Sequence, residues 1–324
     1  MERPRARPSR SSMGTPDVSV IIPAYNAERH IGEALASIRA QTLPAVEILV
    51  VDDGSTDGTV EAVERAGAGL DVTLIRQANA GPAAARNHGI RRARGRYCAF
   101  LDADDTMLPE RLAAQKALFD ADAALGLVHT DLMIFDDTGI IHHTRRAFSE
   151  PCGGTVLDRL LLDNFITTST VMAPKACLID AGLFGEARRV SEDFELWLRM
   201  VARWKVGYID RPLVRYRRRP GSLSDDKLAS TRSALEVVEA FWREHPQHQH
   251  RQPAVYRQSV GQHLATAGMA ALAGGHQRIA IGYLARSLRL NPWRRRVWRA
   301  MAKALLVPAR PSSAAAPANG PRRA

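Results

Sequence analysis

The sequence predicts an α/β protein with a mostly parallel sheet, helices on both faces of that sheet, and a helical extension at the C-terminal side. Short apolar runs alternate with segments of helical spacing through the first third of the chain. Two of these runs end in clusters of aspartate, at the edge where parallel α/β sheets bind ligands. Beyond about residue 228 the chain is rich in alanine and its periodicity is helical.

The first strand is predicted at residues 18–22, an uninterrupted apolar run. A helix is expected at 28–40, because Ile31, Leu35 and Ile38 share one helical face. The same alternation predicts further elements at 47–51, 59–66, 72–75, 82–93, 97–101 and 157–162, and a helix that begins near Ser191.

Composition divides the chain into four parts. Residues 1–16 are rich in Pro, Arg and Ser and are predicted to be disordered, and 308–324 form a low-complexity tail with the same expectation. Residues 17–224 carry the α/β pattern, and 225–307 form the helical extension. The basic start lacks the apolar segment of a secretory signal, and no apolar run is long enough to span a bilayer. We therefore expect a cytoplasmic location.

The net charge of +11 is concentrated near the end of the chain. Residues 245–324 hold 13 of the 45 Lys and Arg residues and no acidic residue, which leaves 32 basic and 34 acidic residues before them. The nearly neutral α/β part argues against a nucleic-acid-binding protein. Cys98, Cys152 and Cys177 form no CxxC pair and are interpreted as buried thiols in a reducing compartment.

Two loops at strand ends have residues suited to a nucleotide. Pro23, Ala24 and Tyr25 follow the first strand, and the tyrosine ring is suited to lie against a nucleobase, although a tyrosine at such a place is often only part of the packing. Asp52 and Asp53 follow the second strand, and their carboxylates are suited to accept hydrogen bonds from a base N–H or a ribose hydroxyl.

Two further segments have residues suited to phosphate and metal. Small residues after Asn79 let a helix start close to a ligand, and Arg86, one turn inside, is suited to pair with a diphosphate or with Asp53. A solvated helix arginine is the alternative. Asp102 and Asp104 follow an apolar strand, and hard oxygen ligands at this spacing suit Mg²⁺ or Mn²⁺.

The helix that begins near Ser191 has acidic residues in its first turn. Ser191 has the side chain of an N-cap residue, and Glu192 and Asp193 follow it. Stabilisation of the helix dipole is one explanation for these acids. The other is that Asp193 acts in chemistry, which the context of the other motifs favours.

Taken together, these motifs resemble glycosyltransferase family 2, a group with the Rossmann-like GT-A fold. The matching segments occur in the order of the family and are VSVIIPAYNAERHIGEALASIRAQT, ILVVDDGSTDGT, NAGPAAARNHGI, GRYCAFLDADD, SEDFELWLR and YRRRPGSLS. The resemblance implies an inverting, metal-dependent transfer of a sugar from a nucleotide-diphosphate donor, usually a UDP-sugar, to an acceptor hydroxyl. It also implies a glycan or lipid-linked acceptor in cell-surface polysaccharide or glycolipid assembly.

The resemblance assigns the nucleotide-sugar site residue by residue. Pro23, Ala24 and Tyr25 would line the nucleobase pocket, Asp53 would bind the base, and Arg86 would lie beside the nucleotide. The same site includes two other residues of these motifs, Asp52 and Asn79.

The resemblance likewise assigns the reaction centre. Asp102 would touch the ribose or the metal, and Asp104 would ligate the divalent cation. Asp193 matches the catalytic base of the family, which takes the proton of the acceptor hydroxyl as its oxygen attacks the anomeric carbon opposite the leaving nucleotide. The helix N-terminus at Ser191 would favour the ionised form of Asp193.

The chain departs from the family at one motif. Many members carry a histidine that helps hold the metal or diphosphate where this chain has Arg219. We hypothesise that Arg217 or Arg219 neutralises the leaving diphosphate as a permanent cation. The sequence also lacks the QxxRW motif of processive synthases, which favours a single-addition enzyme.

The basic tail allows two interpretations. Asn291 is predicted to cap a helix with Pro292 at its first position, and this helix would gather its tryptophans on one side and its basic residues on another. Such a helix either lies on an anionic membrane surface, at the inner face of the membrane, or packs on the rest of the protein. The histidine-rich stretch 245–250 is interpreted as a polar loop.

The sequence argues against three other classes of protein. A sugar nucleotidyltransferase would need a glycine-rich basic loop after the first strand, and a nicotinamide dehydrogenase would need GxGxxG there, whereas this chain has PAYNAERHIG. An inactive sugar-nucleotide-binding relative is disfavoured by the intact Asp102, Asp104 and Asp193.

Overall fold

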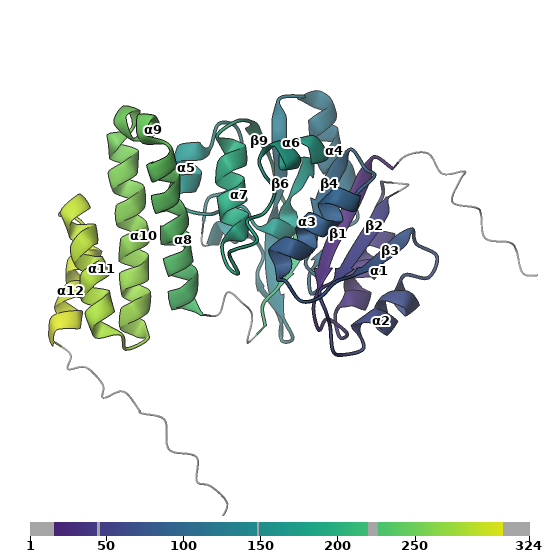
Figure 1. Cartoon of the computed structure of the whole chain (residues 1–324), viewed down its shortest axis with the longest axis horizontal. Coiled ribbons are helices and arrows are strands. Elements are labelled where there is room, and N and C mark those ends of the chain that lie inside the picture. Colours follow the sequence, from purple (N-terminus) through teal and green to yellow (C-terminus); the bar gives the residue numbers. More distant parts are fainter. Residues whose placement is uncertain (1–15, 44–45, 148, 220–225, 307–324) are drawn as a thin grey trace, which may run out of the picture. The chain divides into compact units, whose positions relative to one another are not determined.

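The computed structural model describes residues 16–43, 46–147, 149–219 and 226–306. These residues fall into two compact units, and the second unit begins at Asp226 (Figure 1). Of the segments predicted to be disordered, residues 1–15 and 308–324 lie outside the described part, and so does the end of the YRRRPGSLS motif.

The first unit contains both the strands and the helices expected from the sequence. Its strands are β1 (Val18–Ala24), β2 (Glu47–Asp52), β3 (Val72–Arg76), β4 (Tyr97–Phe100), β5 (Thr106–Met107), β6 (Leu125–Asp136), β7 (Gly139–His142), β8 (Met172–Pro174) and β9 (Lys205–Arg217). Its α-helices are α1 (Ile31–Arg39), α2 (Thr59–Ala66), α3 (Pro82–Arg92), α4 (Arg111–Ala121), α5 (Leu157–Leu162), α6 (Lys175–Asp180) and α7 (Glu192–Val201).

All the strands belong to one mixed sheet. The strand order is β3-β2-β1-β4-β8-β6-β9-β5, with β7 beside β6. The first four strands in this order are parallel, whereas β8 is antiparallel to both β4 and β6. Parallel strands need a long crossover, which α1, α2 and α3 provide, while short connections such as the turn between β6 and β7 give antiparallel pairs. The α/β class is confirmed, and the parallel pairing that the sequence predicts dominates the N-terminal half.

The central strand β1 is buried on both faces. Val18, Val20 and Ile22 face a core to which α1, α2 and α4 contribute. On the opposite face Ile21 meets α3, where a Cβ added to Gly89 would lie only 2.6 Å from Cγ2 of Ile21. Glycine at this position therefore lets α3 approach the sheet closely.

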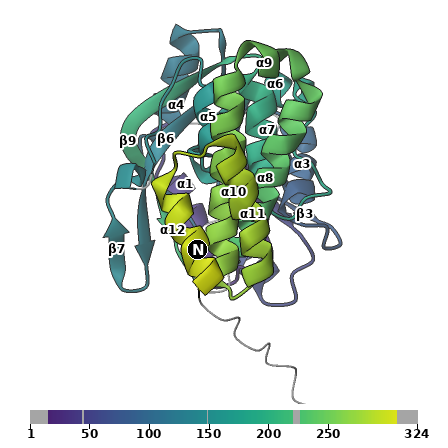
Figure 2. The ribbon, with the colours of Figure 1, turned by 90° about the vertical axis from the view of Figure 1, so that its left-hand side faces the viewer.

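The second unit is entirely helical in its described part. It consists of α8 (Lys227–Glu244), α9 (Pro246–Arg251), α10 (Pro253–Ala273), α11 (Gln277–Leu290) and α12 (Arg295–Leu306). Helix α10 packs between α8 and α11, and α12 packs on α11 and α10 (Figure 2). The histidine-rich stretch 245–250 is therefore not a loop: Pro246 opens α9, and the rings of His245 and His248 stack on Phe241 and Trp242.

The end of this unit corrects the sequence analysis at two points. Asn291 closes α11 and its side chain donates to the carbonyl of Arg257, so it does not open the next helix, which begins at Arg295. The apolar residues of α12 also do not share one side. The buried set is Val297, Met301 and Ala304, and the exposed set is Trp298, Leu305 and Leu306, while Trp293, also exposed, lies before the helix. In the described part of the chain no helix is long and apolar enough to cross a membrane.

Candidate active site

The ends of β1 and β2 lie side by side and form the predicted nucleotide loops. Ala24 pairs with Asp52 in the parallel register, and the N–H of Asp53 donates to the Ala24 carbonyl at 2.8 Å. Ala24 is buried and Pro23 half-buried, whereas Tyr25 is 51% exposed. The Tyr25 ring is therefore accessible to a ligand at this edge of the sheet.

The two adjacent carboxylates after β2 have different surroundings. Asp53 accepts hydrogen bonds from Gln77 Nε2 at 2.8 Å and from the backbone N–H groups of Ala80 and Gly81 at 2.9 and 2.8 Å. Asp52 is buried, and one of its oxygens accepts from the Ser55 N–H at 3.1 Å. Asp53 thus fixes the loop that leads into α3, a role that the sequence did not suggest.

The second oxygen of Asp52 is buried without a hydrogen bond among the described residues, although Arg76 Nε lies 3.5 Å away. A buried carboxylate oxygen without a donor is costly, so this atom is suited to accept from a ligand. Asn79 is exposed on the loop that Asp53 holds. Gly81 begins α3 at φ +91°, a conformation that favours glycine.

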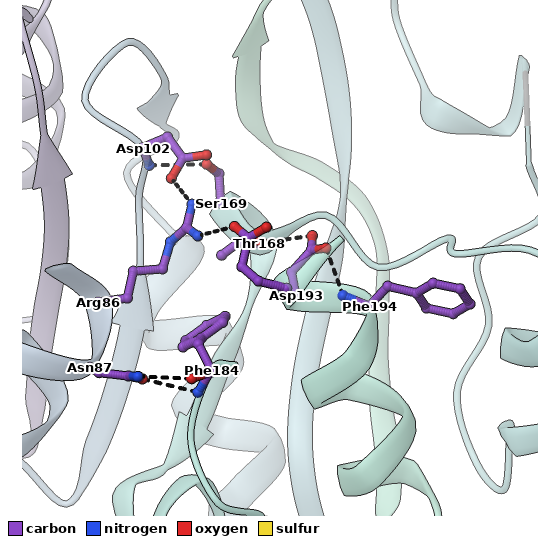
Figure 3. Close-up of polar contacts among 9 residues, drawn as sticks. Arg86, Asn87, Asp102, Thr168, Ser169, Phe184, Asp193 and Phe194 are labelled. Atoms are coloured by element: carbon purple, nitrogen blue, oxygen red, sulfur yellow. Dashed lines mark hydrogen bonds and ion pairs between the residues drawn. The ribbon is translucent and has the colours of Figure 1, made fainter. Parts of the chain in front are cut away.

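Arg86 joins two parts of the site. Its Nη2 lies 2.7 Å from Asp102 Oδ1 and its Nη1 lies 2.8 Å from Glu192 Oε1 (Figure 3). Burial alone would lower the pKa of Arg86, but the carboxylates of Asp102 and Glu192 outweigh it and raise the pKa above its ordinary value. Arg86 is thus a permanent buried cation, and it does not steady Asp53 as the sequence allowed.

Three carboxylates follow β4. Asp102 is partly exposed, and its N–H donates to Ser169 Oγ at 3.0 Å. Asp105 is fully buried, and one of its oxygens accepts from the Arg217 N–H at 2.8 Å. Burial raises the pKa of both Asp104 and Asp105, and the negative charge of Asp102 raises both further. This loop therefore concentrates negative charge that a cation would stabilise.

Arg217 and Arg219, the two arginines of the motif at which this chain departs from the family, differ in their contacts. The Arg217 side chain is nearly buried: Nη2 lies 2.6 Å from Glu33 Oε2 and Nε donates to the Asp104 carbonyl at 3.1 Å. Arg219 is half exposed, and its Nε lies 2.6 Å from Asp104 Oδ2. Arg219 is therefore the arginine of this pair that directly neutralises a predicted metal ligand.

Asp193 lies in the first turn of α7. Its oxygens accept from Thr168 Oγ1 at 2.9 Å and from the Phe194 N–H at 2.6 Å (Figure 3). Burial raises the pKa of Asp193, although Arg86 and these hydrogen bonds act in the opposite direction. The Phe194 N–H in the first turn of α7 favours the ionised form of Asp193, as expected at a helix N-terminus, but burial outweighs this contribution and the net pKa is raised. Ser191 occupies the N-cap position without a side-chain capping hydrogen bond.

Several residues of the site were missed by the sequence analysis. Thr168 and Ser169 lie on the short turn before β8 and contact Asp193 and Asp102, but no motif marks them. Glu192 was considered only for the helix dipole. Asn87 donates to the carbonyl of Phe184 and accepts from its N–H, both at 2.9 Å, which ties α3 to the segment before α7 (Figure 3).

The carboxylates after β4 fit a divalent cation. In the described part of the chain, no three Asp, Glu, His or Cys side chains form a group that could hold a metal ion. Asp102 and Asp104 provide hard oxygen donors, and Asp105 has a buried oxygen without a hydrogen bond among the described residues. Mg²⁺ typically takes one or two protein carboxylates and completes its shell with water and substrate phosphates. The donor set therefore suits a cation that binds together with a diphosphate.

Comparison with known proteins identifies the family of this chain. The profile of the family described as Glycosyl transferase family 2 matches residues 19–177. Over 239 residues the chain is 30% identical to a putative teichuronic acid biosynthesis glycosyltransferase, TuaG of Bacillus subtilis, covering 71% of this chain and 90% of TuaG. The chain belongs to glycosyltransferase family 2.

Other family members differ in length. An uncharacterized glycosyltransferase of Rickettsia felis is 34% identical over 200 residues, which are 62% of this chain and 33% of that protein. The chain thus spans about a third of the length of this and two other Rickettsia relatives.

Solved structures share the fold. S. aureus TarS 1–349 in complex with UDP-GlcNAc superposes with a TM-score of 0.59 at 18% identity, covering 89% of this chain and 92% of that chain. The mannosyltransferase PcManGT from Pyrobaculum calidifontis, in complex with GDP-Man and Mn²⁺, gives 0.59 at 20% identity, covering 90% and 85%. These similarities support a GT-A-like fold for this chain.

Proposed function

We propose that this glycosyltransferase performs a single, inverting transfer from a UDP-sugar to an acceptor hydroxyl. The observation that carries the proposal is the position of Arg86, which joins Asp102 after β4 to Glu192, the neighbour of Asp193 on α7. A buried cation between these segments keeps the proposed donor-binding loop and the proposed base in a fixed relation. Single displacement needs such a relation, because the base and the leaving group act at the same moment.

Asp193 is the proposed general base. Thr168 and the Phe194 N–H fix its carboxylate, and its raised pKa makes it a better proton acceptor than an ordinary aspartate. Glu192 is held by Arg86, which leaves it unsuited to act as a nucleophile. This arrangement supports one displacement with inversion, without a covalent glycosyl intermediate.

The proposed donor site includes Pro23, Ala24, Tyr25, Asp52, Asp53, Asn79 and Arg86. Within it, Asp52 is the proposed acceptor for a base N–H or a ribose hydroxyl, because its Oδ2, 3.5 Å from Arg76 Nε, accepts no hydrogen bond among the described residues, and Asp53 maintains the loop. Uridine is favoured because TarS, which shares the fold, was solved with UDP-GlcNAc. The GDP-Man complex of PcManGT makes guanosine the alternative to be tested.

Asp102 and Asp104 are proposed to hold Mg²⁺ or Mn²⁺. When bound, the cation would neutralise negative charge on the departing diphosphate. Arg219, half exposed and paired with Asp104, is proposed to contact the same phosphates. Arg217 is engaged by Glu33 and the Asp104 carbonyl and is proposed to shape the loop.

Thermal unfolding of the full chain tests this site. UDP, GDP, dTDP and CDP are each added with Mn²⁺ or with EDTA to the native protein and to Asp104→Asn. One nucleotide is expected to raise Tm with Mn²⁺, and the shift is expected to be lost in EDTA and in Asp104→Asn. Glu110→Gln, an exposed acid beyond this loop, is the matched control. Equal shifts with and without metal would contradict the metal assignment.

The acceptor is proposed to be a glycan or lipid-linked glycan at the inner face of the membrane. TuaG, a full-length relative, is named for teichuronic acid biosynthesis. The exposed Trp298 and Leu305 of α12 border basic residues of the same helix, which suits the interface of an anionic bilayer. Trp298→Ser with Leu305→Ser is expected to weaken sedimentation with phosphatidylglycerol vesicles but not with phosphatidylcholine vesicles. Undiminished sedimentation would contradict the membrane role.

A further inference from the structure

The helical unit contains a groove that the transfer reaction does not use. It has a volume of about 490 Å³, with α10 as its floor and α8 and α11 as its walls. Its lining combines the apolar side chains Val260, Leu264 and Leu290 with the rings of Trp242 and Tyr256 and with polar and charged groups. This volume lies within the range of about 300–1,000 Å³ that is usual for ligand sites.

Most of the charged residues that line the groove are basic. Arg243, Arg286 and Arg289 line it, and Glu239 is the one acidic residue among the lining residues. Glu239 is already paired with Arg286, at 2.6 Å between Oε1 and Nη2. Among the described residues, the side chains of Arg243 and Arg289 have no hydrogen bond or ion pair, and both residues are exposed. Two guanidinium groups are therefore available to a ligand at the same groove.

The helical unit as a whole also carries a positive net charge. Residues 226–306 contain 13 Lys and Arg residues and four Asp and Glu residues, so most of the net charge of +11 lies here. Attraction of an anion to the groove is thus reinforced by the surrounding surface.

The aromatic side of the groove is fixed by packing. Trp242 is buried and its Nε1 donates to Ser259 Oγ at 3.0 Å. Its ring stacks with His248 at 5.3 Å between centroids and meets the edge of Tyr256 at 5.6 Å. A wall that is already ordered loses little conformational entropy when a ligand binds.

We propose that this groove binds an anionic glycan, a sugar chain that carries carboxylate or phosphate groups. The chain's anions would pair with Arg243 and Arg289, and the C–H faces of its sugars would lie on Tyr256 and the apolar floor. A single-stranded nucleic acid is less suited, because its bases need a row of open aromatic rings, whereas Trp242 is covered by its neighbours. The proposal deepens the proposed function, since this glycan would be the acceptor strand held away from its reacting end.

Fluorescence anisotropy with the full chain tests the groove. The fluorescein-labelled probes are oligogalacturonate, phosphorylated maltohexaose, neutral maltohexaose and a 20-residue oligoadenylate RNA. The groove variant is Arg243→Gln with Arg289→Gln. The matched control is Arg251→Gln with Arg278→Gln, which removes the same charge from exposed residues of this unit that do not line the groove.

At least one of the two anionic glycans is expected to bind, and the groove variant is expected to weaken its binding by about tenfold or more while the control changes it little. Equal weakening in both variants, equal binding of maltohexaose or of RNA, or no binding of either anionic glycan overturns the proposal. The stabilisation by UDP and Mn²⁺ is measured on the same variants. Because that measurement concerns only the donor site, failure of the groove and failure of the proposed transfer are distinguished.

Discussion

Arg86 and Asp102 form a short ion pair, with 2.7 Å between Nη2 and Oδ1, at the edge of the sheet where β4 ends. The same guanidinium also holds Glu192, so one buried cation compensates two carboxylates that are far apart in the sequence. We therefore expect both the stability of the fold and the proposed transfer to depend on Arg86.

Replacement of Arg86 by methionine is expected to destabilise the fold. Glu192 would be left buried without its cation, and removal of one partner from a buried pair costs about 3 kcal/mol. The double variant Arg86→Met with Glu192→Gln is expected to recover part of this loss, because the uncompensated charge is removed. Urea unfolding of the two variants measures the difference, and equal stabilities would show that charge compensation is not the cause.

The proposed base is tested by Asp193→Asn. The amide keeps the shape of the side chain but cannot accept the acceptor's proton, so kcat is expected to fall by about a thousandfold. Stabilisation by UDP and Mn²⁺ is expected to persist. Glu195→Gln, on the same helix and paired with Arg188, is the control and is expected to retain most of the activity. A comparable loss of kcat in both variants would show that Asp193 is not the general base.

The burial of Asp193 predicts the pH at which kcat/KM falls on the acid side of its pH profile. Because burial raises its pKa, the base is protonated and kcat/KM falls at a higher pH than for an ordinary aspartate. The hydrogen bond from Thr168 lowers this pKa, so Thr168→Val is expected to raise it further and to move the acid limb to higher pH. Initial rates between pH 4 and 9 measure the shift. A limb that stays in place would mean that another group controls it.

His129 is expected to make folding sensitive to acid. It is fully buried, and burial lowers its pKa to about 4 from an ordinary value of 6.5. Between these values the unfolded chain binds more protons than the folded chain, so this contribution to stability is complete above pH 6.5 and is lost as the pH falls toward 4. The loss amounts to about 3 kcal/mol.

The measurement is the unfolding free energy at pH 7 and pH 4 for the native chain and for His129→Gln, which does not titrate. The unfolding free energy of the native chain minus that of His129→Gln is expected to be about 3 kcal/mol smaller at pH 4 than at pH 7. A difference between the two proteins that does not change with pH would refute the assignment.

Local patterns were sufficient to predict the strands and helices around β1 to β4 and the acidic loops that follow them. The position of Asp52, Asp102 and Asp104 at strand ends could be predicted because an apolar strand followed by a carboxylate is visible in the sequence itself. Thr168 and Ser169 could not, because their relation to Asp193 and Asp102 exists only after β8 has joined the sheet.

Local patterns also could not predict how deeply individual side chains are buried. The raised pKa of Asp193 depends on how completely surrounding elements exclude water, whereas its position at a helix N-terminus is a local property. The division of α12 into a buried and an exposed apolar set likewise depends on its neighbours α10 and α11. The groove beside α10 is assembled from four helices, and no single segment indicates it.

The close approach of Gly89 to Ile21 fixes the distance between α3 and the sheet, and with it the position of Arg86. Gly89 lies on α3, about one turn beyond Arg86, and even one methyl group there would come within 2.6 Å of the sheet. A larger side chain at position 89 would have to lift the helix, and the guanidinium would move with it. The alignment of the charges at the end of β4 therefore depends on the absence of a methyl group at position 89, which lies close to the face of α3 that carries Arg86.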